Sequence, residues 1–306
     1  MLVYIKNDIN YTTFINYIIS ISQGFFMKNN NKQQGFTLVE LSIVLVIIGL
    51  IVSGILVGQD MIRAAEIRST VSQIESYNTA VNTFRDKYRN IPGDMLSTDA
   101  TNFGFLGGRV GGVGDGDGNR LVQAGSTPAD QMKLGFETGL FWRDLSKASL
   151  IGNDFVTAAN SLSPAVNAAQ VKAWLPEASI GRGHYFTIHS ESGRNFFSIS
   201  QVNGAAAGGI YTLATAMTPQ TAFNIDDKID DGNPLSGIVN ATWSVTALGT
   251  VIVPPISGTG TLETATLDMG SCAYRVAAAP SPAIYTTASD AQANRPACQL
   301  RIRASF

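Results

Sequence analysis

Histidine and cysteine are scarce in this sequence of 306 residues, which contains two of each. A structural zinc site takes four ligands, chiefly Cys and His. Here the histidines lie far from the cysteines in the sequence, which argues against such a site. Charged residues are also few, at 14% of the chain, and the net charge is −2. Such a chain carries no overall basic footprint, so we expect no nucleic acid among its partners.

Catalytic signatures are missing as well. The sequence has neither a Gly-x-Ser-x-Gly elbow nor a P-loop. The candidate bases are His184 and His189, which fall on one expected strand and which we expect to share one face of a sheet. We therefore predict that the protein is not an enzyme. The alternative of a periplasmic hydrolase on a membrane anchor would require one of these histidines for activity.

One long apolar run dominates the sequence. Residues 41–59 contain no charged side chain, and a helix of this length spans about 30 Å, the thickness of a bilayer core. A secretory signal peptide has a shorter apolar run, of about 7–15 residues. We therefore expect a membrane-spanning helix, and the residues before it indicate which kind of anchor it is.

A polar flank with Lys28 and Lys32 precedes the run and leads into Gly35-Phe36-Thr-Leu-Val-Glu40-Leu. This segment resembles the leader and N-terminus of type IV pilins and of the related type II secretion pseudopilins. The resemblance extends to about residue 89. It implies that a membrane-bound prepilin peptidase cleaves the chain after Gly35 and methylates the new N-terminal residue, Phe36.

The leader has an expected place in the cell. Its lysines hold it on the cytoplasmic side of the bacterial inner membrane by the positive-inside rule, so the precursor crosses that membrane once and the filament lies in the periplasm or outside the cell. The first 26 residues fit the resemblance less well, because family leaders are short. We expect a leader of residues 1–35 that starts at either Met1 or Met27.

Glu40 is a carboxylate at the edge of the apolar segment, where a charge costs about 2–3 kcal/mol. A partner is therefore expected, and cleavage creates one in the ammonium group of Phe36. The resemblance implies that Glu40 of one subunit pairs with the Phe36 amine of a neighbour in the filament. In the alternative, Glu40 only reaches the membrane interface.

The helix is expected to continue beyond the membrane, because no Pro or Gly occurs between Asp60 and Pro92 and apolar residues recur there at steps of three and four. We predict one helix of about 80 Å. Its half at 36–59 lies in lipid or a filament core, and its half at 60–90 packs on a globular domain. The packing face consists of Val71, Ile74, Tyr77, Val81, Phe84 and Tyr88.

The remaining residues, 91–306, are predicted to form one head domain. Its part at 91–183 is rich in loops, with 98–127 glycine-rich and a helix at 128–151, and a sheet occupies about 184–276. A long helix followed by strands predicts an α+β class in which an antiparallel sheet covers the helix, as in the pilin fold. The strand-like runs are 184–189, 195–202, 210–214, 241–253 and 264–276.

Cys272 and Cys298 lie near the end of the head. Outside the cytoplasm a disulfide between them is favoured, and the pair resembles the disulfide-closed C-terminal loop of pilins. Closing a loop at 272–298 contributes about 3.5 kcal/mol in the chain-entropy model. The alternative is two free buried thiols.

Two acidic segments contain possible calcium ligands, although no cofactor is certain. In the first segment oxygen-bearing residues alternate as in part of a calcium-binding loop, but the rest of an EF-hand is missing. The second contains a short expected helix that ends at Gly232, and some pseudopilins use calcium. A solvated turn and a capped helix end explain these segments without metal. The candidate ligands are Asp115, Asp117 and Asn119 in the first segment and Asp226, Asp230 and Asp231 in the second.

The sequence thus predicts a structural subunit that polymerises through its N-terminal helix. Its filament is a type IV pilus, for adhesion, motility or DNA uptake, or a type II secretion pseudopilus. Expected partners are copies of itself or other pilin-like subunits, the prepilin peptidase, an inner-membrane assembly platform and, before assembly, membrane lipid. The alternative is a monomeric single-pass binding protein, which needs neither cleavage at Gly35 nor Glu40.

Overall fold

The computed structural model describes residues 37–105, 116–124, 133–155, 165–206, 209, 211–214, 217–234, 236–244, 251–252, 272–274, 284–285 and 298–306. The chain divides into two units, Met1–Gly58 and Gln59–Phe306. The predicted cleavage site at Gly35 and Phe36 lies outside the described residues, and so does Asp115.

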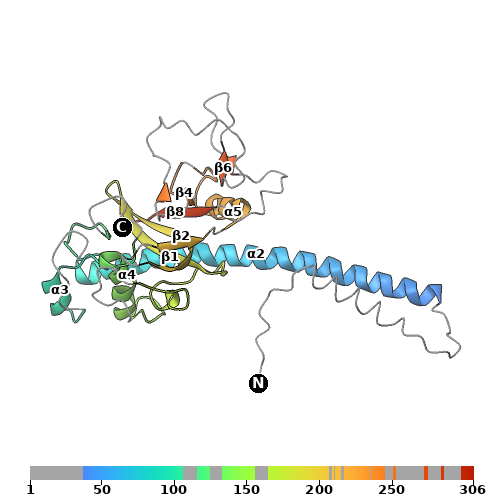
Figure 1. Cartoon of the computed structure of the whole chain (residues 1–306), viewed down its shortest axis with the longest axis horizontal. Coiled ribbons are helices and arrows are strands. Elements are labelled where there is room, and N and C mark those ends of the chain that lie inside the picture. Colours follow the sequence, from blue (N-terminus) through green and yellow to red (C-terminus); the bar gives the residue numbers. More distant parts are fainter. Residues whose placement is uncertain are drawn as a thin grey trace, which may run out of the picture. The chain divides into compact units, whose positions relative to one another are not determined.

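The longest element is helix α2, Leu38–Tyr88, which agrees closely with the single helix expected from the sequence (Figure 1). Residues 37–57 are all exposed. The most apolar window of the helix has a mean hydropathy of 2.9 and contains no buried residue. By length and composition, this half of α2 is able to span a membrane.

The second half of α2 carries the predicted apolar face and buries all of it except Val71, which is half-buried. Tyr77 lies at the centre, with its ring centroid 5.0 Å from that of Trp142, 5.2 Å from that of Phe186 and 6.3 Å from that of Phe197. Because apolar residues three and four positions apart fall on one side of a helix, this face packs continuously. The buried residues are Ile67, Thr70, Ile74, Tyr77, Ala80, Val81, Phe84 and Tyr88.

An antiparallel sheet forms the other layer of this core, which confirms the predicted α+β class. The strand order is β1-β2-β8-β4-β5, and β3 pairs with the far part of β2 (Figure 1). A separate two-stranded sheet joins β6 to β7. The strands are β1 (His184–Glu191), β2 (Arg194–Ala205), β3 (Tyr211–Ala214), β4 (Val239–Ser244), β5 (Val251–Ile252), β6 (Ala273–Tyr274), β7 (Ile284–Tyr285) and β8 (Gln299–Arg303).

The register of the sheet brings one apolar row under α2. Ile188 of β1 pairs with Phe197 of β2, which pairs with Ile302 of β8, and Ile302 pairs with Val239 of β4. All four side chains are buried. Since paired residues on neighbouring strands share a face, this row and the Tyr77 ring form the centre of the core.

Several strands and helices differ from the sequence expectation. The single strand expected at 241–253 is wrong, because β4 and β5 pair antiparallel, with Trp243 opposite Ile252. Strand β8 was not expected at all, yet it lies between β2 and β4. The expected helix at 128–151 is shorter, and one short helix begins the segment expected to be loop. The helices after α2 are α3 (Ser97–Asn102), α4 (Phe136–Lys147), the 3-10 turn η2 (Val171–Ala173) and α5 (Pro219–Ile229).

The expectation that His184 and His189 share a face is also wrong. Both lie on β1, as expected. They are five positions apart, however, and successive side chains of a strand point to opposite faces, so an odd step places the two rings on different faces. His189 stacks on Phe196 with ring centroids 5.8 Å apart, whereas Nδ1 of His184 lies 2.6 Å from the Gly181 carbonyl oxygen. The two rings therefore cannot act as one site.

Candidate functional site: the N-terminal helix segment and two acidic clusters

Glu40 lies in the first turn of α2 and is bonded to Thr37. Its Oε2 accepts hydrogen bonds from the Thr37 backbone N–H at 2.8 Å and from the Thr37 hydroxyl at 2.9 Å, and the Glu40 N–H donates to Thr37 Oγ1 at 3.2 Å. This reciprocal pattern is a capping box. Its signal, Thr-x-x-Glu ahead of an apolar run, is present in the sequence but was not used in predicting a partner for Glu40.

The apolar half of α2 after Glu40 is uncovered within the described chain. Leu38 is 86% exposed and Leu50 is 71% exposed. Side chains so apolar need lipid or other apolar helices around them. Gly54 and Gly58 lie one turn apart, with no atom of another described segment near them, and this spacing permits close approach of a second helix.

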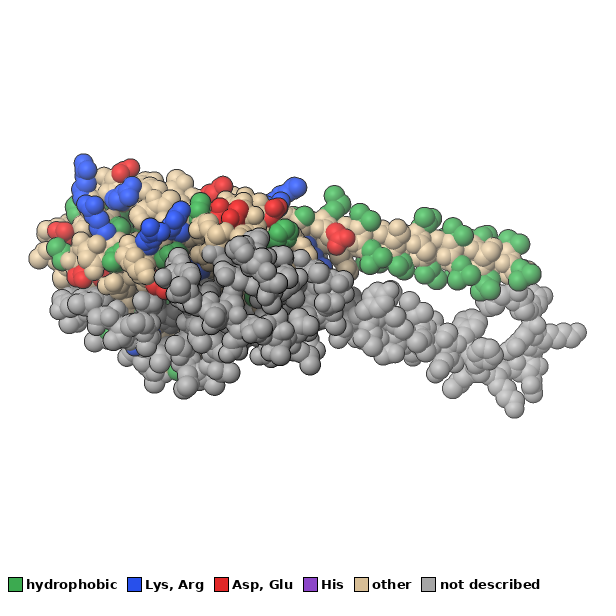
Figure 2. All heavy atoms as spheres, turned by 90° about the horizontal axis from the view of Figure 1, so that it is seen from above, with side chains coloured by type: hydrophobic (Ala, Val, Ile, Leu, Met, Phe, Trp, Pro, Cys, Tyr) green, Lys and Arg blue, Asp and Glu red, His purple; other side chains and the backbone are tan. Residues whose placement is uncertain are grey.

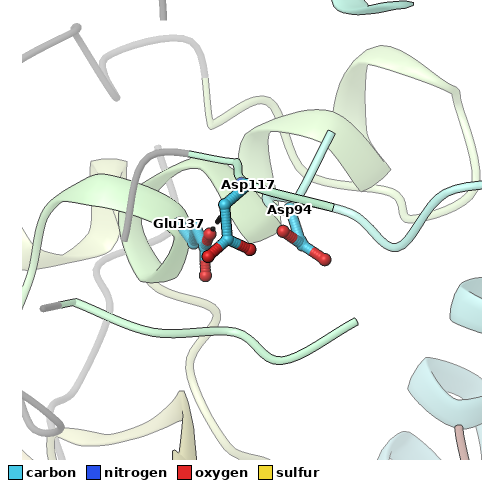
Figure 3. A group of neighbouring side chains, drawn as sticks. All are labelled: Asp94, Asp117 and Glu137. Carbon is cyan, nitrogen blue, oxygen red and sulfur yellow. Dashed lines mark hydrogen bonds between the residues drawn. The ribbon is translucent and has the colours of Figure 1, made fainter. Parts of the chain in front are cut away.

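The first acidic cluster consists of Asp94, Asp117 and Glu137, whose carboxylate oxygens lie within 4.8 Å of one another (Figure 3). Asp94 follows the end of α2, and Glu137 lies in the first turn of α4. Of the three, only Asp117 was a predicted ligand. Asp94 and Glu137 were missed because the turn after α2 and the start of α4 are far apart in the sequence.

Backbone N–H groups of the loop at 116–124 occupy this cluster. Glu137 accepts hydrogen bonds from the N–H of Gly116 at 2.9 Å and of Gln123 at 2.6 Å. Asp94 accepts from the N–H of Gly118 at 2.7 Å and of Arg120 at 2.6 Å. Four N–H groups are thereby satisfied by two buried carboxyl groups, so the cluster clamps the loop onto the ends of α2 and α4.

Burial sets the charge of this clamp. It raises the pKa of Glu137 to about 9, with the charge of Asp94 as the second cause, and it raises the pKa of Asp94 to about 6. Glu137 therefore carries a proton at neutral pH. The predicted ligands Asp117 and Asn119 serve the turn itself, because Asn119 donates to Asp117 from its backbone N–H at 3.0 Å and from Nδ2 at 2.8 Å. These contacts favour a structural role for this cluster, in which it holds the loop at 116–124 in place.

The second cluster consists of Asp226, Asp230 and Asp231, as grouped in the sequence. Asp230 Oδ2 accepts from the backbone N–H of Ile238 and, at 3.3 Å, of Val239. Asp231 Oδ2 accepts from the Ser236 hydroxyl at 2.8 Å. These bonds fix both carboxylates at the end of α5.

Asp226 is the member of this cluster with an unpartnered carboxylate oxygen among the described residues. It is buried, and its Oδ2 accepts from the Tyr285 hydroxyl at 2.8 Å. Among the described residues its buried Oδ1 makes no well-formed hydrogen bond, and the nearby Gly232 N–H acts on the carboxyl only to lower its pKa. Burial raises the pKa of Asp226 to about 7, and the charges of Asp231 and Asp230 act in the same direction. An all-oxygen set with an unfilled buried oxygen fits calcium, which stays a prediction for these three residues.

The predicted disulfide is present. Cys272 and Cys298 are bonded and both are fully buried. Cys298 also exchanges two backbone hydrogen bonds with Met217, at 3.0 and 3.1 Å. The bond thus joins the residue just before β6 to the residue just before the central strand β8.

Of the two candidate bases, His189 is placed for packing. His189 is 3% exposed. Burial lowers its pKa to about 3, and the Arg301 charge acts in the same direction. A neutral, enclosed ring of this kind has no open path to a substrate, and its contact with Phe196 accounts for its position.

The fold and the N-terminal segment together define a class: an α+β protein of pilin-like architecture with a long apolar N-terminal helix. A family model for the prokaryotic N-terminal methylation motif matches residues 30–56, which confirms the resemblance drawn from the sequence. The chain therefore carries the type IV pilin and pseudopilin signature. Comparison with curated proteins gives no match, and neither does comparison with solved structures.

Proposed function

We propose that this chain is a filament subunit, cleaved by a prepilin peptidase between Gly35 and Phe36, methylated at Phe36, and polymerised through the apolar half of α2. The filament is a type IV pilus or a type II secretion pseudopilus, built by an inner-membrane assembly platform. The precursor is anchored in the inner membrane by one helix. The role of the subunit is structural and not enzymatic.

The observation that carries the proposal is the exposure of the apolar half of α2, which follows Thr37. The methylation motif covers this segment, and its apolar side chains are exposed at every position up to residue 57. Lipid covers such a surface before assembly, and the same surface on neighbouring copies covers it in a filament core. Removal of the leader frees the N-terminal end of the helix and so allows the helix to leave the membrane.

Glu40 is proposed to change partners during assembly. In the free chain its carboxylate is held by Thr37 of the same helix. In the filament it pairs with the Phe36 ammonium of a neighbouring copy, a contact in which both partners are charged, whereas the Thr37 donors that it replaces are neutral. Methylation of the amine keeps its positive charge. The capping box therefore holds the carboxylate in its helical position until the neighbour arrives.

The test replaces Glu40 in cells that assemble the filament. We expect Glu40→Ala to reduce the amount of the chain in sheared filaments at least about tenfold, because one buried charge pair is lost. Processing at Gly35 should continue. Glu75→Ala is the matched control, because Glu75 is an exposed acid on the other half of the same helix. It should assemble normally.

The monomeric membrane-anchored binding protein predicts a different result. Such a protein needs the apolar helix but neither the free amine nor Glu40. Normal surface exposure of the Glu40→Ala chain, together with the absence of the wild-type chain from any filament fraction, would favour that alternative over assembly.

A further inference from the structure

Five arginines gather on one surface of the unit Gln59–Phe306. They lie around two neighbouring hollows of about 380 and 420 Å³, and Arg85 and Arg120 line both. All five side chains are exposed. Figure 2 shows Lys and Arg side chains gathered toward one end of this unit. The arginine patch consists of Arg85 and Arg89 at the end of α2, Arg120 in the clamped loop, Arg194 in β2 and Arg303 in β8.

The arginine patch has little compensating charge. Of the acids that line its hollows, Asp86 is exposed, whereas Asp94 is buried and accepts backbone hydrogen bonds. Across the described part of the chain, no ion pair or side-chain hydrogen bond involves any of the five guanidinium groups. Like charges held together without partners repel one another, so an anionic surface is the partner that this patch fits.

The patch is also held in place before any partner binds. The Arg120 N–H donates to Asp94 at 2.6 Å, and the Arg120 carbonyl accepts from Asn195 Nδ2 at 2.9 Å. Arg85 and Arg89 lie in and just after the last turn of α2. Because α2 and the Asp94 contact already fix the backbone at these arginines, little backbone freedom is lost on binding. This favours recognition of a surface whose anionic groups have a matching spacing.

A surface of the opposite charge exists on the same chain, at the end of α5. It consists of Asp227, Asp230 and Asp231, and we call it the α5 acidic surface. Asp227 and Asp231 are exposed, and Asp230 is half-buried. Lys228 is the one cation between them in the sequence. Without a bound cation these three carboxylates and Lys228 sum to a charge of −2, and one calcium ion held together with Asp226 would still leave −1.

The two surfaces lie at different levels along α2. Residues of α5 up to Lys228 line one hollow of about 910 Å³ together with α2 residues from Asp60 to Ile67. Within that hollow, Arg63 and Arg182 balance Asp60 and Glu66. The arginine patch begins at Arg85, so at 1.5 Å per residue the two surfaces are about 35 Å apart along the helix.

We propose that the arginine patch of one copy binds the α5 acidic surface of another copy, displaced by about 35 Å along the helix axis. This inference rests on the proposed function, because it supplies a contact between heads in the same filament. The contact joins two different surfaces of identical chains, and such a heterologous contact does not close on itself but continues as an open helical assembly. The heads then set the stagger of the subunits while α2 provides the apolar core.

Cross-linking in assembled filaments tests this placement. The full chain carries Arg89→Cys together with Asp227→Cys, and filaments are treated with a short bismaleimide. The native cysteines are fully buried in a disulfide and do not react. We expect a ladder of covalent oligomers from the double variant. Neither single variant should give one, and dimers from Arg89→Cys alone would overturn the proposal by showing a symmetric contact.

Charge reversal gives an independent readout. Arg85→Glu with Arg120→Glu should lower incorporation into filaments about tenfold, which is the size of effect expected from repulsive charges at a contact. Adding Asp227→Lys in the same chain should restore part of it, because the new lysine offers the new glutamates an opposite charge. Lys147→Glu is the control, since this exposed lysine of α4 belongs to neither surface.

The outcomes separate this inference from the proposed function. If incorporation depends on Glu40 but is unchanged by the arginine reversals, and no ladder forms, the head contact is wrong and the filament subunit stands. If the wild-type chain enters no filament, the proposed function fails first. Binding of a labelled DNA oligonucleotide that is lost in Arg85→Glu with Arg120→Glu, without any ladder, would assign the patch to nucleic acid and overturn the contact between copies.

Discussion

Gly93 lies against the backbone of Glu137 so closely that a methyl group on its Cα would be 2.4 Å from the Glu137 carbonyl oxygen. The Gly93 backbone is also left-handed, with φ +84°, and its N–H donates to Asp144 Oδ2 at 2.8 Å. The turn that ends α2 is thus pressed against the first turns of α4. Only glycine satisfies both the backbone conformation and the contact.

Replacing Gly93 by alanine should therefore destabilise the head more than a turn substitution normally does. Gly193 is the matched control, because it has φ +72° but open space around its Cα. We expect Gly193→Ala to cost about 1–2 kcal/mol, and Gly93→Ala at least about 2 kcal/mol more. Urea unfolding followed by fluorescence of the buried Trp142 measures the difference. Equal losses would show that the close approach to Glu137 does not exist.

The clamp predicts a pH dependence of stability. The pKa of Glu137 is raised to about 9, above its value in the unfolded chain, so the native state binds more protons than the unfolded state in the interval between them. Stability therefore falls as pH rises from about 5 to about 9, by a few kcal/mol. Asp94, with its pKa raised to about 6, acts in the same direction at the lower end.

Unfolding in urea at several pH values tests this sign. The slope of stability against pH should be markedly smaller in Glu137→Gln, which has no proton to lose. Glu75→Gln, at an exposed position of α2, should keep the wild-type slope. A wild-type stability that rises between pH 5 and pH 9 would contradict the protonated state assigned to Glu137.

The disulfide is predicted to stabilise the head. Cys272 and Cys298 are 26 positions apart, a loop for which the chain-entropy model gives about 3–4 kcal/mol. Cys272→Ser with Cys298→Ser should lower the free energy of unfolding by this amount and loosen the start of β8 first. Hydrogen exchange at the Cys298 and Met217 amides reports the local effect. Unchanged urea midpoints with and without reductant would rule out a stabilising bond.

The calcium prediction for the second cluster has a direct probe. Tyr285 donates to Asp226, so its ring is close enough to sensitise terbium luminescence if the lanthanide binds in place of calcium. We expect a terbium signal that calcium displaces and that Asp226→Asn reduces about tenfold or more in affinity. Asp227→Asn is the control, since Asp227 is exposed and outside the cluster. Equal signals in the two variants would leave the cluster without a metal role.

The long helix and its two halves were predictable because their signals are local. An uncharged apolar run and a period of three to four residues are properties of neighbouring positions, and α2 begins and ends within two residues of the prediction. The capping box at Thr37 and Glu40 was equally readable, as Thr-x-x-Glu before an apolar run.

Features that depend on distant contacts were missed. Strand β8 is only five residues long, and its place between β2 and β4 follows from side chains on both neighbours and not from its own sequence. The pairing of Asp94 with Glu137 around one loop likewise requires the fold. The error over His184 and His189 was different, since the odd spacing that separates their faces was visible in the sequence.

The central claim is that the native chain is a processed and methylated subunit, and intact-mass spectrometry of the protein purified from its own cells tests it in one spectrum. We predict a chain that begins at Phe36, carries one methyl group on its N-terminal amine and retains the Cys272–Cys298 bond. A native protein that keeps residues up to Gly35, in cells with an active prepilin peptidase, would contradict this account.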